Sequence, residues 1–289
     1  MAKQKYIIEN QESFNLKHIF ECGQCFRWNK EKNGSYTGVI KSGVINVETN
    51  GNSIIFTGNC NGNFENIINE YFDLNANYME YKEKLSKVDN YLKESIKFGE
   101  GIRILKQDLW ECIISFIISA NNNIPRIKKI IERISYCYGK KVEFNNKEYF
   151  LFPTPMELSK ASVEELRNMG VGFRDIRLFN TTKKIINNEV NLEYIQNLDN
   201  SQKIRDELLK LDGVGPKVAD CIMLFSLKRL DVFPIDVWVR RVMNELYIQN
   251  ENEEDVNKNE LKKIAEEKFS CLSGIAQQYL FYWKREMGG

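Results

Sequence analysis

The sequence is poor in histidine, because His18 is the single one among 289 residues. Ser-His-Asp and Cys-His catalysis rely on a histidine as general base, and multi-histidine metal sites need several. This scarcity leaves carboxylates, lysines and thiols as the side chains available for chemistry.

An excess of one charge and long apolar runs are also lacking. The 41 basic and 40 acidic side chains leave a formal net charge of +1, so any surface for nucleic acid must be local. No run of about 18 apolar residues and no leader-like start occurs, so we expect a cytoplasmic protein without a membrane partner. The 43% of hydrophobic residues suffices for one large domain or two ordinary ones.

Cysteine is present in an odd number that suits reduced thiols better than a disulfide framework. A structural zinc site needs four ligands, and the single CxxC pair, Cys22 and Cys25, has no second pair at suitable spacing. We therefore expect no zinc. The seven cysteines are at positions 22, 25, 60, 112, 137, 221 and 271.

The hydrophobic pattern changes along the chain. "YTGVIKSGVINVETNGNSIIFTGN" (36–59) alternates as in strands, and its Asn50-Gly51 pair indicates a hairpin. From about residue 95 the period is helical, and "LWECIISFIISA" (109–120) predicts a central buried helix. We expect an α+β fold in which an amino-terminal antiparallel sheet domain, 1–95, docks on a larger, almost entirely helical region, 96–289.

Capping residues and glycines within the second region predict several tight connections between helices. Ser162 with Glu165 is typical of a capping box, Gly170 of a helix stop, and the Asn-rich stretch 187–201 of surface loops with helix caps. A Gly-Val-Gly turn occurs at 170–172 and again at 213–215, which predicts two helical hairpins.

The stretch "LDGVGPKVADC" (211–221) predicts a helix-hairpin-helix over about 201–227. Gly213 and Gly215 permit positive φ and close approach of a ligand, and Pro216 suits the first turn of the second helix. The free N–H groups of that turn would bind a DNA phosphate without reading sequence. A plain helical corner would use the same glycines, and both interpretations remain open at this point.

Downstream, "VFPIDVWVRR" (232–241) places Asp236 before a helix that begins near Val237. An aspartate at this position is an ordinary N-cap, and capping alone would explain it.

Taken together, Leu211 to Asp236 resembles the helix-hairpin-helix and aspartate signature of the base-excision DNA glycosylase superfamily. Four further segments resemble the 8-oxoguanine DNA glycosylases and extend the resemblance over nearly the whole chain. They are "CGQCFRW" (22–28), "SANNNIPRI" (119–127), "MGVGFR" (169–174) and "GIAQQYLF" (274–281).

The resemblance implies a lysine nucleophile at Lys217, which attacks C1′ of the damaged nucleotide, forms a Schiff base and cleaves the strand by β-elimination. It implies that Asp236 stabilises the charge on the sugar. A lysine ordinarily has a pKa of about 10.4, so we expect a desolvated pocket that lowers it. Apolar walls are expected from Val218, Leu224, Phe225 and Phe281.

The resemblance also assigns base recognition to four residues. The Gly23 carbonyl would accept from N7–H of 8-oxoguanine, where guanine has an acceptor instead. Gln277 would bind the Watson–Crick edge, while Phe281 and Cys221 would stack on the two faces of the base. The ordinary structural roles of these residues are a turn glycine, a solvated glutamine, a core phenylalanine and a small buried hydrophobe.

DNA contacts are implied at further positions. Asn121 and Arg126 would serve the orphaned partner base, and Phe173 would wedge into the stack where many eukaryotic relatives carry tyrosine. Their ordinary roles would be a helix cap, a solvated arginine and a core phenylalanine. Phosphate contacts are expected at the hairpin (Gly213, Gly215, Val218) and from Trp238, where eukaryotic relatives have histidine.

Cofactors and partners follow from the same resemblance. Endonuclease-III-type relatives bind an iron–sulfur cluster through four carboxyl-terminal cysteines, and only Cys271 lies in that tail, so we expect no cluster and no other cofactor, apart from a possible cation on the hairpin carbonyls. The expected partner is double-stranded DNA with oxidised guanine, bound by a monomer that is nucleoid-associated in a prokaryote. Two alternatives are an alkyl-base glycosylase that activates water and a structure-selective DNA-binding protein without catalysis.

Overall fold

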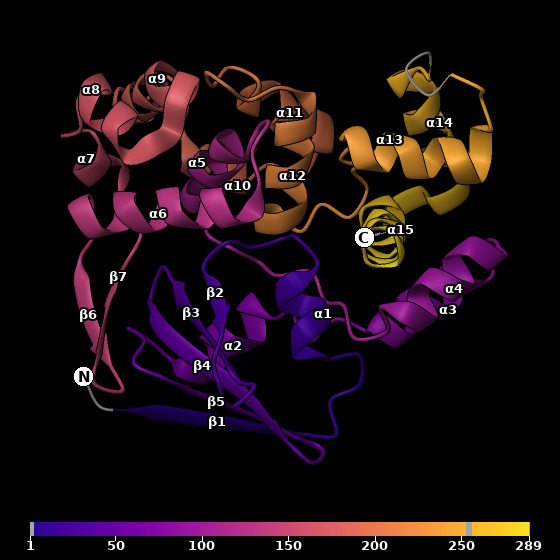
Figure 1. Cartoon of the computed structure of the whole chain (residues 1–289), viewed down its shortest axis with the longest axis horizontal. Helices are drawn as coiled ribbons and strands as arrows, with labels where there is room; N and C mark the ends of the chain where they lie inside the picture. The colour runs from indigo at the N-terminus through magenta and orange to yellow at the C-terminus, as the bar shows by residue number, and fades with distance from the viewer. Residues whose placement is uncertain (1–2, 253–255, 289) are drawn as a thin grey trace.

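The structure, a computed structural model, describes residues 3–252 and 256–288. Its amino-terminal part is built on a five-stranded antiparallel sheet in the order β1-β5-β4-β3-β2 (Figure 1). The predicted sheet and the turn after Asn50 are therefore confirmed. The strands are β1 (Gln4–Glu9), β2 (Trp28–Lys30), β3 (Tyr36–Ile40), β4 (Gly43–Asn50) and β5 (Ser53–Gly58).

Two helices complete the core of the sheet. Ile19 on α1 (Leu16–Glu21) and Ile68 on α2 (Phe64–Tyr71) are fully buried with Val47 and Phe56 of the sheet. The alternation of apolar side chains along β4 and β5 places one face of each strand against these helices. This packing fixes the loop that follows α1, which contributes to the candidate site.

Helices begin earlier than the sequence pattern predicted. α3 (Tyr78–Ser86) and α4 (Asn90–Phe98) precede or cross residue 95, and Leu92 and Ile96 of α4 are buried in the core of the helical region. α4 packs against the last helix, α15 (Ser273–Met287), as Figure 1 shows. The expectation of sheet up to about residue 95 was wrong because apolar residues four apart give α4 a buried helical face. The domain division at residue 95 stays a prediction.

The predicted central helix is confirmed as α5 (Leu109–Ser119), in which all residues except Glu111 and Ser119 are buried. α5 packs against α6 (Ile124–Tyr138) and against α12 (Pro216–Leu227), the second helix of the hairpin. α5 therefore contacts the helix that carries Lys217, the residue proposed as the nucleophile.

The region after residue 96 is not entirely helical. "KVEFNNKEYF" (141–150) forms a hairpin of β6 (Lys141–Phe144) and β7 (Lys147–Phe150), which extends along the sheet in Figure 1. Asn145 and Asn146 both have positive φ, which a two-residue type I′ turn requires. Phe144 packs on Val39 and Val44, so the hairpin fastens the helical region to the sheet.

The remaining helices enclose α5 and α12. The Asn-rich stretch 187–201, predicted as surface loop with helix caps, contains the short helix α10 (Leu192–Gln196) with its cap at Asn191. The others are α7 (Pro155–Leu158), α8 (Val163–Leu166), α9 (Asp175–Ile186), α11 (Ser201–Leu208), α13 (Val237–Met243) and α14 (Lys258–Phe269). Among the described residues, none of the helices is both long and apolar enough to cross a membrane.

Candidate active site

The predicted helix-hairpin-helix is formed by α11, a tight turn and α12. Gly213 has a φ of +86°, at which a side chain would be strained, and a Cβ there would also come within 3.1 Å of Ile117 and Arg177. Gly215 has a φ of −95°, so it does not use the positive φ that glycine permits. α11 ends at Leu208, and Leu209 to Gly213 make the turn.

The start of α12 presents free backbone donors. Gly215 is its N-cap, and glycine has no side chain with which to accept from the first turn; a Cβ on it would meet open space. Pro216 occupies the first helical position as predicted. Val218 has a buried side chain, so a DNA contact there would be limited to its backbone N–H. Unpaired N–H groups at the positive end of a 12-residue helix form an anion site.

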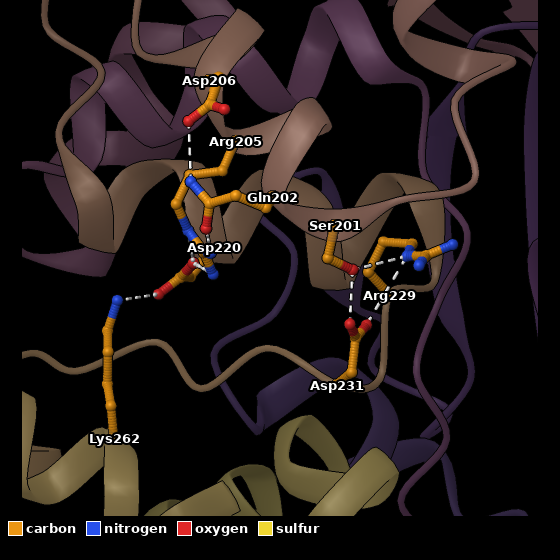
Figure 2. Close-up of polar contacts among 8 residues, drawn as sticks. All are labelled: Ser201, Gln202, Arg205, Asp206, Asp220, Arg229, Asp231 and Lys262. Atoms are coloured by element: carbon orange, nitrogen blue, oxygen red, sulfur yellow. Dashed lines mark hydrogen bonds and ion pairs between the residues drawn. The ribbon is translucent and has the colours of Figure 1, made fainter.

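A buried ion pair holds the two hairpin helices together on the side away from the turn (Figure 2). Nε and Nη2 of Arg205 on α11 donate to Oδ1 of Asp220 on α12, at 2.9 and 2.5 Å, and Nζ of Lys262 lies 3.6 Å from Oδ2. Burial raises the pKa of Asp220, while the two cations act in the opposite direction. Lys217 lies three residues earlier on the same helix, α12.

Lys217 lies over an aromatic wall rather than in open solvent. Its Nζ is 5.9 Å from the centre of the Phe116 ring on α5. Phe116 stacks on Phe225 at 5.6 Å and meets the edge of Phe26 at 5.5 Å. Phe225 was among the predicted walls, but the direct contact is made by Phe116, which sequence reasoning did not find. No local motif marked it, because it was one apolar residue of a uniformly apolar helix.

The pKa of Lys217 is raised, not lowered as expected. Its causes are attraction to Cys221, one helical turn away, and to the Asp236 carboxylate, and these outweigh the opposing effect of burial. Burial in turn raises the pKa of the Cys221 thiol. This shift favours the ammonium form of the amine, which must lose a proton before it can act as a nucleophile.

Asp236 has the position that the sequence predicted. It is the N-cap of α13, and its Oδ1 accepts from the N–H of Val239 at 2.8 Å. Because it also interacts electrostatically with Lys217, capping and a role beside the amine coexist in one side chain. α13 thus carries the candidate carboxylate to the second helix of the hairpin.

Gly23 and Phe281 are brought together although they are far apart in the sequence. Gly23 has a φ of +91°, and a Cβ there would lie 3.4 Å from Cε1 of Phe281 and 3.2 Å from Nη1 of Arg285. Sequence reasoning missed Arg285, whose guanidinium lies 5.4 Å from the centre of the Phe281 ring. The loop after α1 and the helix α15 therefore together form one wall of the candidate base pocket.

The two other base-recognition candidates are buried. Gln277 is 5% exposed, so the ordinary role of a solvated glutamine does not apply, and its Oε1 accepts from Gln278 at 2.8 Å. Cys221 is 4% exposed and lies beside Lys217 on α12. Its burial agrees with both roles left open, a small core residue and a surface for the base.

Gln24 holds the Gly23 loop in place and was not singled out from the sequence. It is fully buried, and its Nε2 donates to the carbonyls of Ile19 and Arg103, both at 2.8 Å. Its Oε1 accepts from the N–H of Leu105 at 2.9 Å. With three partners for one amide, the backbone next to Gly23 has little freedom.

Asn121, Arg126 and Phe173 gather at a second place on the surface. Phe173 is 57% exposed, so the ordinary role of a core phenylalanine does not apply. Asn121 is exposed with a φ of +50°, and the N-cap of α6 is Asn123 instead, so the helix-cap role proposed for Asn121 was wrong. Nη2 of Arg126 donates to the carbonyl of Gly170 at 3.2 Å, in the turn that carries Phe173.

Trp238 is 43% exposed in the first turn of α13, with Arg241 5.8 Å from its ring centre. An exposed indole beside a guanidinium can donate to a phosphate. Within residues 3–252 and 256–288, no group of three or more His, Cys, Asp or Glu side chains is arranged to hold a metal ion.

Comparisons with known proteins agree with this arrangement. Residues 6–113 match the amino-terminal domain of 8-oxoguanine DNA glycosylase, and residues 114–268 match the HhH-GPD superfamily of base excision DNA repair proteins. The N-glycosylase/DNA lyase of Saccharomyces cerevisiae is 32% identical over 281 residues, which cover 88% of this chain and 73% of the yeast protein.

Solved structures give the same result at higher similarity. The apo-form of the Clostridium acetobutylicum 8-oxoguanine glycosylase/lyase is 46% identical, with a TM-score of 0.91 and 98% of each chain covered. Its complex with double-stranded DNA containing cytosine opposite 8-oxoG gives a TM-score of 0.93 at 45% identity, covering 100% of this chain and 99% of the other. The chain belongs to the 8-oxoguanine DNA glycosylase/lyase family of the HhH-GPD superfamily.

Proposed function

We propose that this protein excises 8-oxoguanine from double-stranded DNA and then cleaves the strand at the resulting site. The observation that carries the proposal is the position of Lys217 on the second hairpin helix, over Phe116 and beside Asp236. A primary amine near a carboxylate and an apolar wall is suited to nucleophilic catalysis at a sugar carbon.

The reaction begins when the neutral amine of Lys217 attacks C1′ of the everted nucleotide. The electrons of the N-glycosidic bond leave with the base, which takes up a proton, and Asp236 stabilises the positive charge on the sugar. Opening of the sugar ring gives a protonated Schiff base between Nζ and C1′. Loss of a proton from C2′ then expels the 3′ phosphate, and water releases the amine.

DNA binding is distributed over two places on the protein. The free N–H groups at the start of α12 take a backbone phosphate, and Trp238 on α13 takes another. Phe173 replaces the everted base in the stack, with Asn121 and Arg126 beside the orphaned base. In the pocket, the Gly23 carbonyl accepts from N7–H, Gln277 binds the Watson–Crick edge, and Phe281 and Cys221 contact the faces of the base.

The alternatives have less support. An alkyl-base glycosylase that activates water has no use for a lysine at this hairpin position, and a non-catalytic DNA-binding protein has no use for Gln277 buried near Phe281 on α15. We further propose a cytoplasmic monomer, nucleoid-associated in a prokaryote, that acts without a resident cofactor and whose hairpin carbonyls can hold a cation.

Borohydride trapping on a duplex with 8-oxoguanine tests the proposal. Reduction of the Schiff base should leave wild-type protein covalently attached to DNA, and Lys217→Gln should give no adduct. Lys210→Gln is the matched control, because this lysine of the same hairpin pairs with Glu207. Equal trapping of wild type and Lys217→Gln would remove Lys217 from its role.

A further inference from the structure

We infer that Arg285 reads the C8 oxygen of the everted base, as a specificity-determining residue of the pocket. The inference rests on the proposed function, because it adds a fifth residue to the four proposed for base recognition. It starts from the contact between Arg285 and Gly23, which no motif in the sequence marked.

Three of the nitrogens of Arg285 differ in their surroundings. Nη2 donates to the carbonyl of Glu21, two residues before Gly23, and Nε and Nη2 lie 3.3 and 2.9 Å from Oε1 of Glu286. Nη1 is buried and finds no hydrogen-bond partner among the described residues. A buried N–H of a charged group without a partner is costly, so an acceptor supplied by a ligand would be bound strongly.

Nη1 lies close to both Gly23 and the ring of Phe281. It lies 3.2 Å from the position of a Cβ on Gly23, and the same position is 3.4 Å from the edge of the Phe281 ring. The unpaired donor, the glycine backbone and the stacking ring therefore meet at one point. A side chain at Gly23 would separate them, which gives a second reason for glycine at this position.

The order of residues along α15 indicates which atom of the base Arg285 would contact. Gln277, Phe281 and Arg285 are four residues apart, so they follow one another along one side of the helix at steps of about 6 Å. If Gln277 binds the Watson–Crick edge and Phe281 supports the ring, Arg285 lies beyond the opposite end of the purine. That end carries N7–H and the C8 oxygen.

The chemistry fits the discrimination that the pocket must make. Guanine has a C–H at C8, whereas 8-oxoguanine has a carbonyl oxygen next to N7–H. Gly23 can accept from N7–H but cannot sense the oxygen, and the guanidinium can donate to it without disturbing N7–H. With guanine in the pocket, Nη1 would stay unpaired and the complex would be weaker.

A double comparison of protein and substrate tests the inference. Single-turnover excision is measured with full-length wild type and Arg285→Met on duplexes containing 8-oxoguanine or 8-thioguanine. Both bases keep N7–H, but sulfur is a weaker acceptor than oxygen. We expect Arg285→Met to slow excision of 8-oxoguanine by between about tenfold and a hundredfold and excision of 8-thioguanine much less.

Two controls separate folding from recognition. Strand cleavage at a preformed abasic site needs Lys217 but no base, so Arg285→Met should leave this rate unchanged. Lys284→Met, at a neighbouring position that pairs with Glu245, should behave as wild type on every substrate. Arg285→Lys keeps the charge and serves if the methionine variant loses lyase activity; its selectivity should fall between those of wild type and methionine.

The outcomes are distinct. A loss of the preference for oxygen over sulfur in Arg285→Met supports the inference. An equal slowing on both substrates would mean that Arg285 only ties Glu21 to α15, and no slowing on either would also overturn the inference. Failure of wild type to excise 8-oxoguanine at all would instead overturn the proposed function.

Discussion

Nη2 of Arg174 donates a 3.0 Å hydrogen bond to the main-chain carbonyl of Asn121. The same guanidinium bonds the carbonyl of Val171 at 2.9 Å and packs on the Phe173 ring, 4.2 Å from its centre. Arg174 is 2% exposed, so the link is protected from water. The exposed phenylalanine and the exposed asparagine, 52 positions apart in the sequence, are thereby held as one rigid unit.

Phe173→Ala should slow excision of 8-oxoguanine from duplex DNA by between about tenfold and a hundredfold, because base–aromatic stacking is worth about 1–3 kcal/mol. The ring is 57% exposed, so the free energy of unfolding should change by less than about 0.5 kcal/mol. Single-turnover excision and urea unfolding measure the two quantities. Met156→Ala, at a residue 63% exposed on α7, is the control and should change neither. A fully active Phe173→Ala would contradict a wedge.

Asp236→Asn should lower the rate and also move its pH dependence. The pKa of Lys217 is raised first by Cys221 and then by the Asp236 carboxylate, so removal of this anion lowers it. The rise of the excision rate with pH, which follows deprotonation of the amine, should therefore shift to lower pH. The maximal rate should fall by about a hundredfold because the charge on the sugar loses its partner.

Asparagine is also a good N-cap, so the start of α13 should survive this substitution. Single-turnover rates across a pH series would check the shift. A profile that falls in height but keeps its wild-type midpoint would show that Asp236 does not act on the amine.

Gln24→Leu should destabilise the protein by roughly 3 kcal/mol, because two carbonyls and one N–H lose their buried partner. The loop containing Gly23 should lose its fixed position, so excision of 8-oxoguanine should fall more than cleavage at a preformed abasic site. Urea unfolding and the two rates test this. Gln202→Ala, at an exposed glutamine, is the control. Equal loss of both activities would contradict a role of Gln24 in the base pocket.

Glu111 should make stability depend on pH. Desolvation of this half-buried side chain raises its pKa from 4.5 to about 7, against the lowering effect of Arg27. The folded state therefore holds a proton that the unfolded state releases, and stability should fall by roughly 3 kcal/mol as the pH rises from about 4.5 through about 7. Glu111→Gln should remove this loss and be more stable than wild type at pH of about 8.

Urea unfolding of wild type and variant at several pH values measures the effect. Glu164→Gln, at an exposed glutamate of α8, should follow the wild-type pH dependence. If the free energy of unfolding of Glu111→Gln kept the wild-type dependence on pH, a group other than Glu111 would cause the loss of stability.

The sequence was informative where the structure depends on local signals. Gly213, Pro216 and the cap at Asp236 were predictable because φ, the first helical turn and N-caps depend on single residue types. The β6–β7 hairpin also had such a signal, since the Asn145-Asn146 pair lies between two alternating segments, and it was overlooked.

The contacts around the site could not be predicted in this way. Phe116 lies below Lys217 because α5 packs on α12, and Arg285 reaches Gly23 because side chains of α15 contact α1, as Tyr282 does at His18. The direction of the pKa shift at Lys217 was missed for the same reason. Burial was foreseen, but the proximity of Cys221 and Asp236 to the amine is a tertiary property.

The pocket proposed for the base is made from opposite ends of the chain, with Gly23 meeting side chains of α15, the last helix. During synthesis on the ribosome, the loop with Gly23 emerges early, and more than 250 further residues are added before Phe281. The hairpin and Lys217 are complete before that time. A nascent or carboxyl-terminally shortened chain would therefore carry the amine without the wall that selects its target, and only the finished polypeptide joins the two.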